Sequence, residues 1–117
     1  MPKKAHRPAP SSRTGNLVVL VTCPSRKIGE MLGRTLVHER LAACVNVVPN
    51  LTSIYRWEGR ICREAEVLLV IKTRRIRLPV LIRRVRGLHP YTIPEIVALP
   101  LAGGSAPYLS WLRDSTT

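Results

Sequence analysis

The chain has 117 residues and a formal net charge of +12 at pH 7, with 19 Lys and Arg against 7 Asp and Glu. This length suits one domain, and no apolar run reaches the roughly 20 residues that cross a membrane. The first residues contain no apolar stretch, so we expect no secretory signal and a cytoplasmic location. The charge surplus is compatible with a nucleic-acid surface, a pocket for an acidic ligand, or a solubility bias of the source organism.

The chain begins with a segment that lacks apolar periodicity. Residues 1–16 contain three prolines and four Lys or Arg but no acidic residue, and we predict a disordered basic tail there. A single domain is expected over residues 17–117. Its three cysteines, Cys23, Cys44 and Cys62, are odd in number and fit no zinc spacing, which favours reduced thiols over a disulfide.

The domain opens with a strand and a helix. Leu17–Cys23 reads LVVLVTC, a β-branched apolar run typical of a strand buried on both faces. Pro24 ends this strand, and Ser25 can cap the helix that follows. The apolar side of that helix recurs at spacings of three and four: Ile28, Met31, Leu32, Thr35 and Leu36. Gly29 and Gly33 on this helix each cost about 1 kcal/mol against Ala, which a close approach to a neighbouring element could justify.

A long β ribbon comes next. The predicted strand Ala42–Trp57 is broken once, at Pro49-Asn50, and the Glu58-Gly59 pair favours a two-residue hairpin turn. The returning strand, Ile61–Thr73, alternates in its first half and is apolar on both faces in its second half. Strands usually have five or six residues, so we expect a second chain to cover part of this ribbon.

The last third of the chain alternates again between helix and strand. Pro79 suits the first turn of a second helix, whose apolar face is Leu78, Leu81, Ile82, Val85 and Leu88. Two prolines hold residues 89–95 extended. Ile96–Leu99 is predicted as a strand and Pro107–Leu112 as a short terminal helix. The order β α β β α β, with an extra C-terminal helix, indicates an α+β, ferredoxin-like fold on one antiparallel sheet.

Six segments in this order carry a family resemblance. They are VTCP (21–24), ERLAACVN (39–46), SIYRWEGRI (53–61), EVLLVIKT (66–73), HPYTIPEIVALP (89–100) and YLSWL (108–112). Over Leu17 to about Asp114 the chain resembles the CutA divalent-cation tolerance proteins. The resemblance implies a ferredoxin-like fold and a tight homotrimer in which the long ribbon crosses to the next subunit. It also implies tolerance to copper and other divalent metals, with no catalytic reaction and no required cofactor.

Two residues are candidate ligands for a copper ion. His89 carries an imidazole, which binds copper and zinc, although a histidine at a helix end can equally cap carbonyls. Cys23 ends the first strand, on the side of the sheet where the HPY segment begins, and a thiolate beside an imidazole selects copper. A small buried core residue is the favoured interpretation of Cys23. Cys44 is read as packing, and Cys62 as an exposed thiol.

A second group of residues could line a cleft between subunits: Tyr91, Glu95, Lys72, Trp57 and Glu66. The large aromatic residues near the ribbon are more simply interface core, and the charged ones could be ordinary ion pairs, which is favoured for Lys72.

Three functions follow from the sequence. The first is a homotrimer that binds copper or other metal ions and takes part in metal homeostasis. The alternative is a trimeric regulatory scaffold, similar in fold to the PII signalling proteins, that binds a small anionic ligand or a partner protein in clefts between subunits. Nucleic-acid binding ranks last, because the arginines are dispersed and no aromatic residues interleave with a basic groove. No membrane partner is expected.

Overall fold

The computed structural model describes residues 15–117, so residues 1–14 of the predicted tail lie outside the described residues. The elements are β1 (Asn16–Cys23), α2 (Arg26–His38), β2 (Cys44–Trp57), β3 (Arg60–Arg74), the 3-10 turn η1 (Arg75–Arg77), α3 (Leu78–Leu88), β4 (Ile96–Pro100) and α4 (Ala106–Asp114). They form one antiparallel sheet with strand order β2-β3-β1-β4, which confirms the predicted α+β fold. No helix of this described part is long and apolar enough to cross a bilayer.

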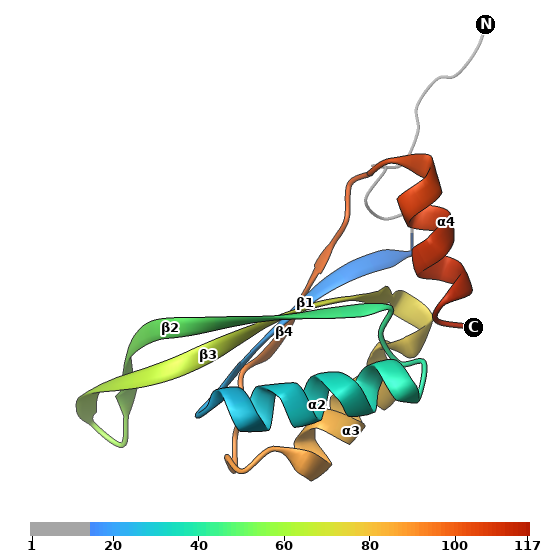
Figure 1. The fold of residues 1–117 in the computed structure, drawn as a ribbon. Coiled ribbons are helices and arrows are strands. Elements are labelled where there is room, and N and C mark those ends of the chain that lie inside the picture. Colours follow the sequence, from blue (N-terminus) through green and yellow to red (C-terminus); the bar gives the residue numbers. More distant parts are fainter. Residues whose placement is uncertain (1–14) are drawn as a thin grey trace, which may run out of the picture.

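The helices α2 and α3 cover one face of the sheet and make the core with it (Figure 1). The strands β1 and β3 send alternate side chains to this face, among them Val19, Val21, Leu69 and Ile71, all fully buried. The helices pack against this face with apolar residues that their spacing predicted. The buried leucine and valine side chains among them are Leu32, Leu36, Leu81 and Val85. Ser25 caps α2 as expected, its hydroxyl accepting from the N–H of Ile28 at 3.2 Å.

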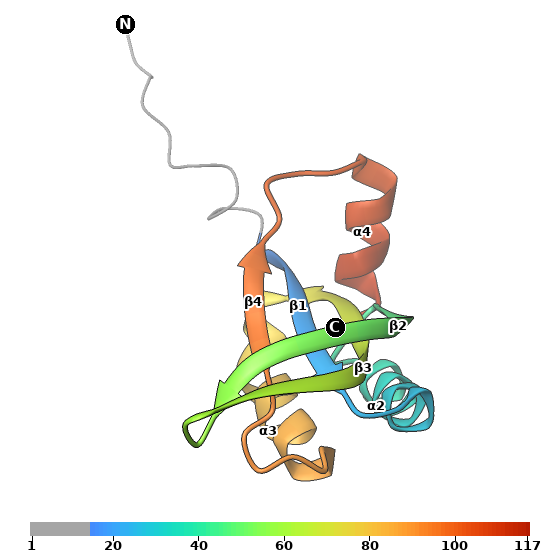
Figure 2. The same ribbon diagram turned by 90° about the vertical axis from the view of Figure 1, so that its left-hand side faces the viewer.

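The β2–β3 ribbon projects past the helices toward its hairpin turn (Figures 1 and 2). Its pairing register shifts between Val48 and Leu51, so the break predicted at Pro49-Asn50 is a β-bulge, with Asn50 at φ 64°. At the tip, Glu58 and Gly59 have φ angles of 50° and 80°, the left-handed pair of a two-residue hairpin. The turn and the break were therefore both readable from sequence.

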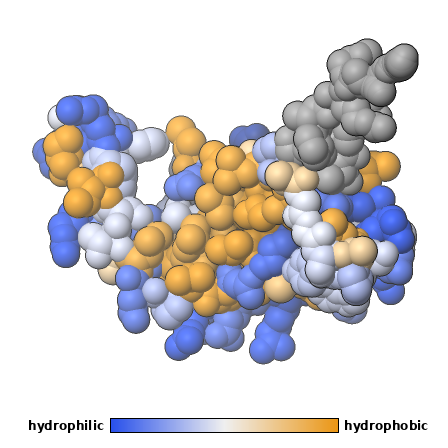
Figure 3. Space-filling view, turned by 90° about the horizontal axis from the view of Figure 1, so that it is seen from above, coloured by the Kyte–Doolittle hydropathy of each residue, from blue (hydrophilic) through white to orange (hydrophobic). Residues whose placement is uncertain are grey.

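The opposite face of the sheet carries a patch of apolar side chains (Figure 3). Among residues 15–117, neither α2 nor α3 covers this face, because both lie on the other side of the sheet (Figure 1). In the antiparallel pairing of β1 with β4, Val18 faces Leu99 and Leu20 faces Val97. Leu99 is 53% exposed and Val97 47% exposed. Soluble monomers rarely expose a continuous apolar area of this kind.

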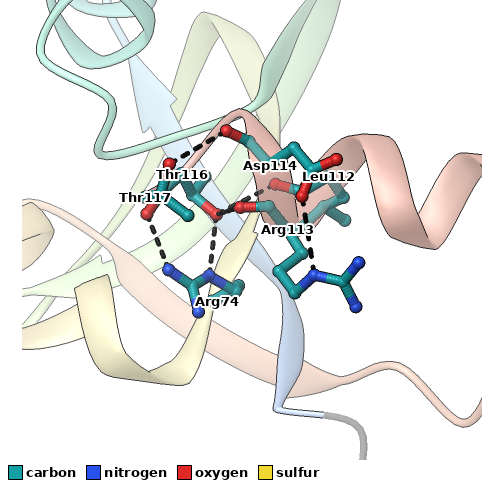
Figure 4. Close-up of polar contacts among 6 residues, drawn as sticks. All are labelled: Arg74, Leu112, Arg113, Asp114, Thr116 and Thr117. Atoms are coloured by element: carbon teal, nitrogen blue, oxygen red, sulfur yellow. Dashed lines mark hydrogen bonds and ion pairs between the residues drawn. The ribbon is translucent and has the colours of Figure 1, made fainter.

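The C-terminal helix α4 is fastened to β3 by the residues just beyond its end (Figure 4). Arg74 donates from Nε to Thr116 Oγ1 and from Nη2 to Thr116 O, both at 2.8 Å, and Arg77 Nε donates to the same carbonyl at 2.8 Å. Thr116 is fully buried, and its hydroxyl donates to Leu112 O at 2.9 Å. Two of the surplus arginines therefore hold the fold together rather than face a partner.

Candidate functional site

His89 is buried directly after α3, and both of its ring nitrogens have hydrogen-bond partners. The backbone N–H of Tyr91 donates to Nδ1 at 3.1 Å, so Nδ1 accepts. Nε2 then carries the proton and donates to the carbonyl of Thr22 at 2.8 Å. The ring thereby ties the segment after α3 to the end of β1. A metal ion can reach either nitrogen only by displacing one of these hydrogen bonds.

Cys23 is fully buried at the end of β1. Its sulfur lies 3.8 Å from Val67 O and 3.9 Å from Ser25 O, distances at which a thiol donates weakly. Burial, and secondarily the nearby Glu66 carboxylate, raises the pKa of Cys23 from 9.0 to about 11. The thiol is therefore protonated at neutral pH, as a small packed core residue would be.

The two predicted copper ligands thus lie at the same end of β1, since His89 bonds to Thr22 and Cys23 is the next residue. Within residues 15–117, no group of three or more His, Cys, Asp or Glu side chains is arranged to hold a metal ion. The pair is therefore at most a two-ligand site. Cys44 and Cys62 are half-buried, whereas Cys23 is buried, and all three thiols are free.

A cleft of about 730 Å³ lies between the ribbon and the segment that follows His89, which bends at residues 90–93 instead of running extended as predicted. The structure brings four of the five predicted cleft residues to it, from β2, from β3 and from this bent segment: Trp57, Glu66, Tyr91 and Glu95. The pairing of Ser53 with Glu64 and of Tyr55 with Cys62 places further polar and aromatic side chains along the same wall.

Glu66 and Tyr91 form the central contact of this cleft. The Tyr91 hydroxyl donates to Glu66 Oε2 at 2.8 Å, and Glu66 is only 8% exposed. Burial, followed by this hydrogen bond to a carboxylate, raises the pKa of Tyr91 well above its usual range, so the phenol stays protonated. The ring of Tyr91 also lies against that of His89, with centroids 4.7 Å apart.

Lys72 does not line the cleft. Its ammonium donates to Asn46 Oδ1, a neutral amide on β2, instead of joining the ion pair that the sequence favoured. Lys72 pairs with Val18 in β1 and with Cys44 in β2, which places it well along β3 from Glu66. Its distance from the acidic residues follows from strand register, which sequence alone does not give.

Glu64 and Tyr55 also line the cleft, although Glu64 was not predicted there and Tyr55 was considered only as one of the aromatic residues near the ribbon, favoured as interface core with an aromatic-lined cleft as the alternative. A usable signal was present for Glu64, because strand alternation puts it on the same face of β3 as Glu66. The place of Tyr55 in the cleft depends on the register of β2 against β3, in which it faces Cys62.

Comparison with known proteins decides the family. Residues 17–115 match the family described as CutA1 divalent ion tolerance protein. The chain belongs to the CutA1 family. This confirms the resemblance and agrees with the ferredoxin-like order of elements.

Similar proteins of the CutA1 family come from distant organisms. The chain is 56% identical over 99 residues to the divalent-cation tolerance protein CutA of Thermus thermophilus, covering 85% of this chain and 96% of that protein. It is 44% identical to human protein CutA, covering 94% of this chain but 65% of that protein.

Solved CutA1 structures share the fold. The Thermus thermophilus structure superposes with a TM-score of 0.86 at 54% identity, covering 87% of this chain and 99% of that one. CutA1 from Oryza sativa superposes with a TM-score of 0.85 at 46% identity, covering 87% of this chain and 94% of that one. The names of other relatives point to different compartments, two chloroplastic and one periplasmic, so the cytoplasmic location stays a prediction for this chain.

Proposed function

We propose that this CutA1-family chain forms a homotrimer that takes part in the response to divalent metal ions and binds copper through Cys23 and His89. The single observation that carries the proposal is membership of a family named for divalent-ion tolerance, over residues 17–115. The position of both candidate ligands at one end of β1 supports the choice of site. In this proposal copper is cargo, and the fold forms without it.

Assembly is supported by the uncovered face of the sheet. Val97 and Leu99 on β4, with Val48 on β2, are each more than 40% exposed, and all three are apolar. The ribbon also presents β2 as an edge strand of 14 residues, whose outer side pairs with no other strand of residues 15–117. A second and third copy would cover the apolar face and pair this edge.

Copper in the reduced state suits the pair of ligands best. A soft thiolate favours Cu(I), whereas structural zinc asks for four ligands. Binding has two costs here, because Cys23 must lose its proton and the His89 ring must release a hydrogen bond. We therefore expect binding of moderate strength that weakens as the pH falls.

The alternative function, a regulatory scaffold, would use this cleft, but the lining of the cleft does not suit the small anionic ligand that was expected. Three carboxylates line the cleft, from Glu64, Glu66 and Glu95. These negative charges disfavour a small anion. We do not propose the anionic ligand for that reason.

The test is a copper titration of the reduced protein against a competing Cu(I) chelator. Wild type is compared with Cys23→Ala and with His89→Gln, which keeps a hydrogen-bonding side chain at the buried position. The matched control is Cys62→Ala, which removes a half-exposed thiol. We expect one copper per chain in wild type and in the control, and an affinity at least about tenfold weaker in the other two variants.

Two results would contradict this site. Copper held no more tightly than the chelator background is one, and equal binding by wild type and Cys23→Ala is the other. Circular dichroism of each variant separates lost binding from lost fold.

A further inference from the structure

The acidic residues of this basic chain are concentrated in one place. The chain has 7 Asp and Glu against 19 Lys and Arg, and three of the acidic residues line the 730 Å³ cleft. None of the residues that line it is Lys or Arg. With 19 Lys and Arg among 117 residues, an even distribution would place about two of them among the residues that line the cleft. The wall of this cleft is therefore selectively negative on a positive molecule.

The carboxylate of Glu66 lacks a counter-cation among residues 15–117. Its Oε2 accepts from Tyr91, whereas Oε1 makes no hydrogen bond within this part of the chain. Because no fully buried polar side-chain atom of residues 15–117 lacks a partner, Oε1 lies at the cleft surface. The ion pairs within these residues are Arg26–Glu30, Arg84–Glu39 and Arg113–Asp114, all outside the cleft. Glu66 is more than nine-tenths buried, and a buried carboxylate is costly unless a cation or further donors compensate it.

The size and lining of the cleft fit an organic cation better than a bare metal ion. Its volume falls within the roughly 300–1,000 Å³ of small-molecule sites. No metal-binding group of three side chains occurs in the described chain. Three aromatic residues join the carboxylates in the lining: Tyr55, Trp57 and Tyr91. Aromatic faces attract ammonium groups through their negative π-clouds, and Trp does so best.

We propose that this cleft is a binding site for a small organic ammonium ion, with Glu66 and Glu64 facing the charge and Tyr55, Trp57 and Tyr91 holding the apolar part. Glu66 supplies a carboxylate oxygen, Oε1, that makes no hydrogen bond within residues 15–117. Trp57 is 46% exposed and lines the same cleft. The inference goes beyond the copper site at Cys23 and His89 and does not depend on it, since neither residue lines the cleft.

The experiment uses the full chain in a Trp111→Phe background, which leaves Trp57 as the single tryptophan. Benzyltrimethylammonium is titrated while Trp57 emission is followed, with benzyl alcohol and benzoate as neutral and anionic comparators. We expect saturable binding of the ammonium probe only. Glu66→Gln and Glu64→Gln should each weaken it by roughly tenfold, because each removes a charge that faces the ligand.

The matched control is Glu58→Gln, which removes the same charge from the exposed hairpin turn outside the cleft. It should leave the affinity unchanged within about twofold. The proposal is overturned if the ammonium probe binds no better than benzyl alcohol, or if Glu58→Gln weakens it as much as the two cleft variants. Glu64 is exposed, so Glu64→Gln keeps the test valid even if the buried variant unfolds. A negative result here leaves the copper titration unaffected, and the reverse also holds.

Discussion

Cys23 illustrates how burial decides the chemistry of a single residue. The same side chain is a potential copper ligand in the sequence and a protonated, fully buried thiol in the structure. The nucleophile and the metal ligand are both the thiolate form, which burial and Glu66 disfavour. Reactivity at this position is therefore suppressed unless a metal replaces the proton.

At the residue scale, the Cys23 thiol of the native protein should not react with a thiol-specific disulfide reagent at pH 8. The native wild type and native Cys23→Ala should then titrate with the same number of thiols. After unfolding in urea they should differ by one, because the chain has 3 cysteines. A native count that falls in Cys23→Ala would show that the thiol is accessible and ionised.

The raised pKa also fixes the direction of a pH effect. The folded state holds the Cys23 proton up to about pH 11, whereas the unfolded chain loses it near 9.0. The neutral buried thiol therefore contributes stability that is complete below about pH 9 and is lost as the pH rises toward 11. Unfolding in urea across this range should show a decline that is smaller in Cys23→Ala.

Helix α2 owes its close contact with the sheet to two glycines. A Cβ added at Gly29 would lie 3.1 Å from Leu69 Cδ2 and 3.3 Å from Cys23 Sγ. A Cβ at Gly33 would lie 3.3 Å from Val45 Cγ1. The close approach offered as a reason for these two glycines is present. The packing gained by this close contact offsets the lower helix propensity of glycine relative to alanine.

At the element scale, Gly29→Ala should destabilise the protein by roughly 1 kcal/mol, because overpacking outweighs the gain in helix propensity. Gly87 in α3 is the matched control, since nothing lies within 4 Å of a Cβ built there. Gly87→Ala should stabilise by up to about 1 kcal/mol. The measurement is the free energy of unfolding in urea. A change in the free energy of unfolding with the same sign in both variants would refute packing as the reason for glycine at position 29.

The whole molecule has a covered face and an uncovered one. The helices α2 and α3 bury one side of the sheet, whereas Val97 and Leu99 are left half-exposed on the other. Isolated apolar residues on a surface need no explanation, but paired rows across β1 and β4 do. Assembly of several copies is the arrangement that would bury them.

At the scale of the molecule, Leu99→Asp should shift the assembly toward smaller species. Burying a leucine is worth about 1.5–3 kcal/mol, and an aspartate there would bring an unpaired charge into each interface. Light scattering after gel filtration gives the mass, and we expect three chains for wild type. Ile76→Asp is the control, because Ile76 is 71% exposed in η1, outside the sheet, and should leave the mass unchanged. A wild type that runs as a monomer would refute the proposed trimer.

The sequence by itself determined the order of elements, the break at Pro49-Asn50, the turn at Glu58-Gly59 and the buried sides of α2 and α3. Each of these depends on local backbone preferences or on periodicity within one segment, which a single chain displays directly. The family followed from several such motifs in fixed order.

Only the tertiary structure decided what the functional residues touch. The hydrogen bonds at both nitrogens of His89, the amide partner of Lys72 and the Tyr91–Glu66 contact join residues that are up to 67 positions apart. The cleft is built from the ribbon and the segment after α3, so its acidic lining was not visible in any one motif. Distances between remote segments depend on strand register and helix packing, because these set which side chains meet, and local sequence patterns do not fix them.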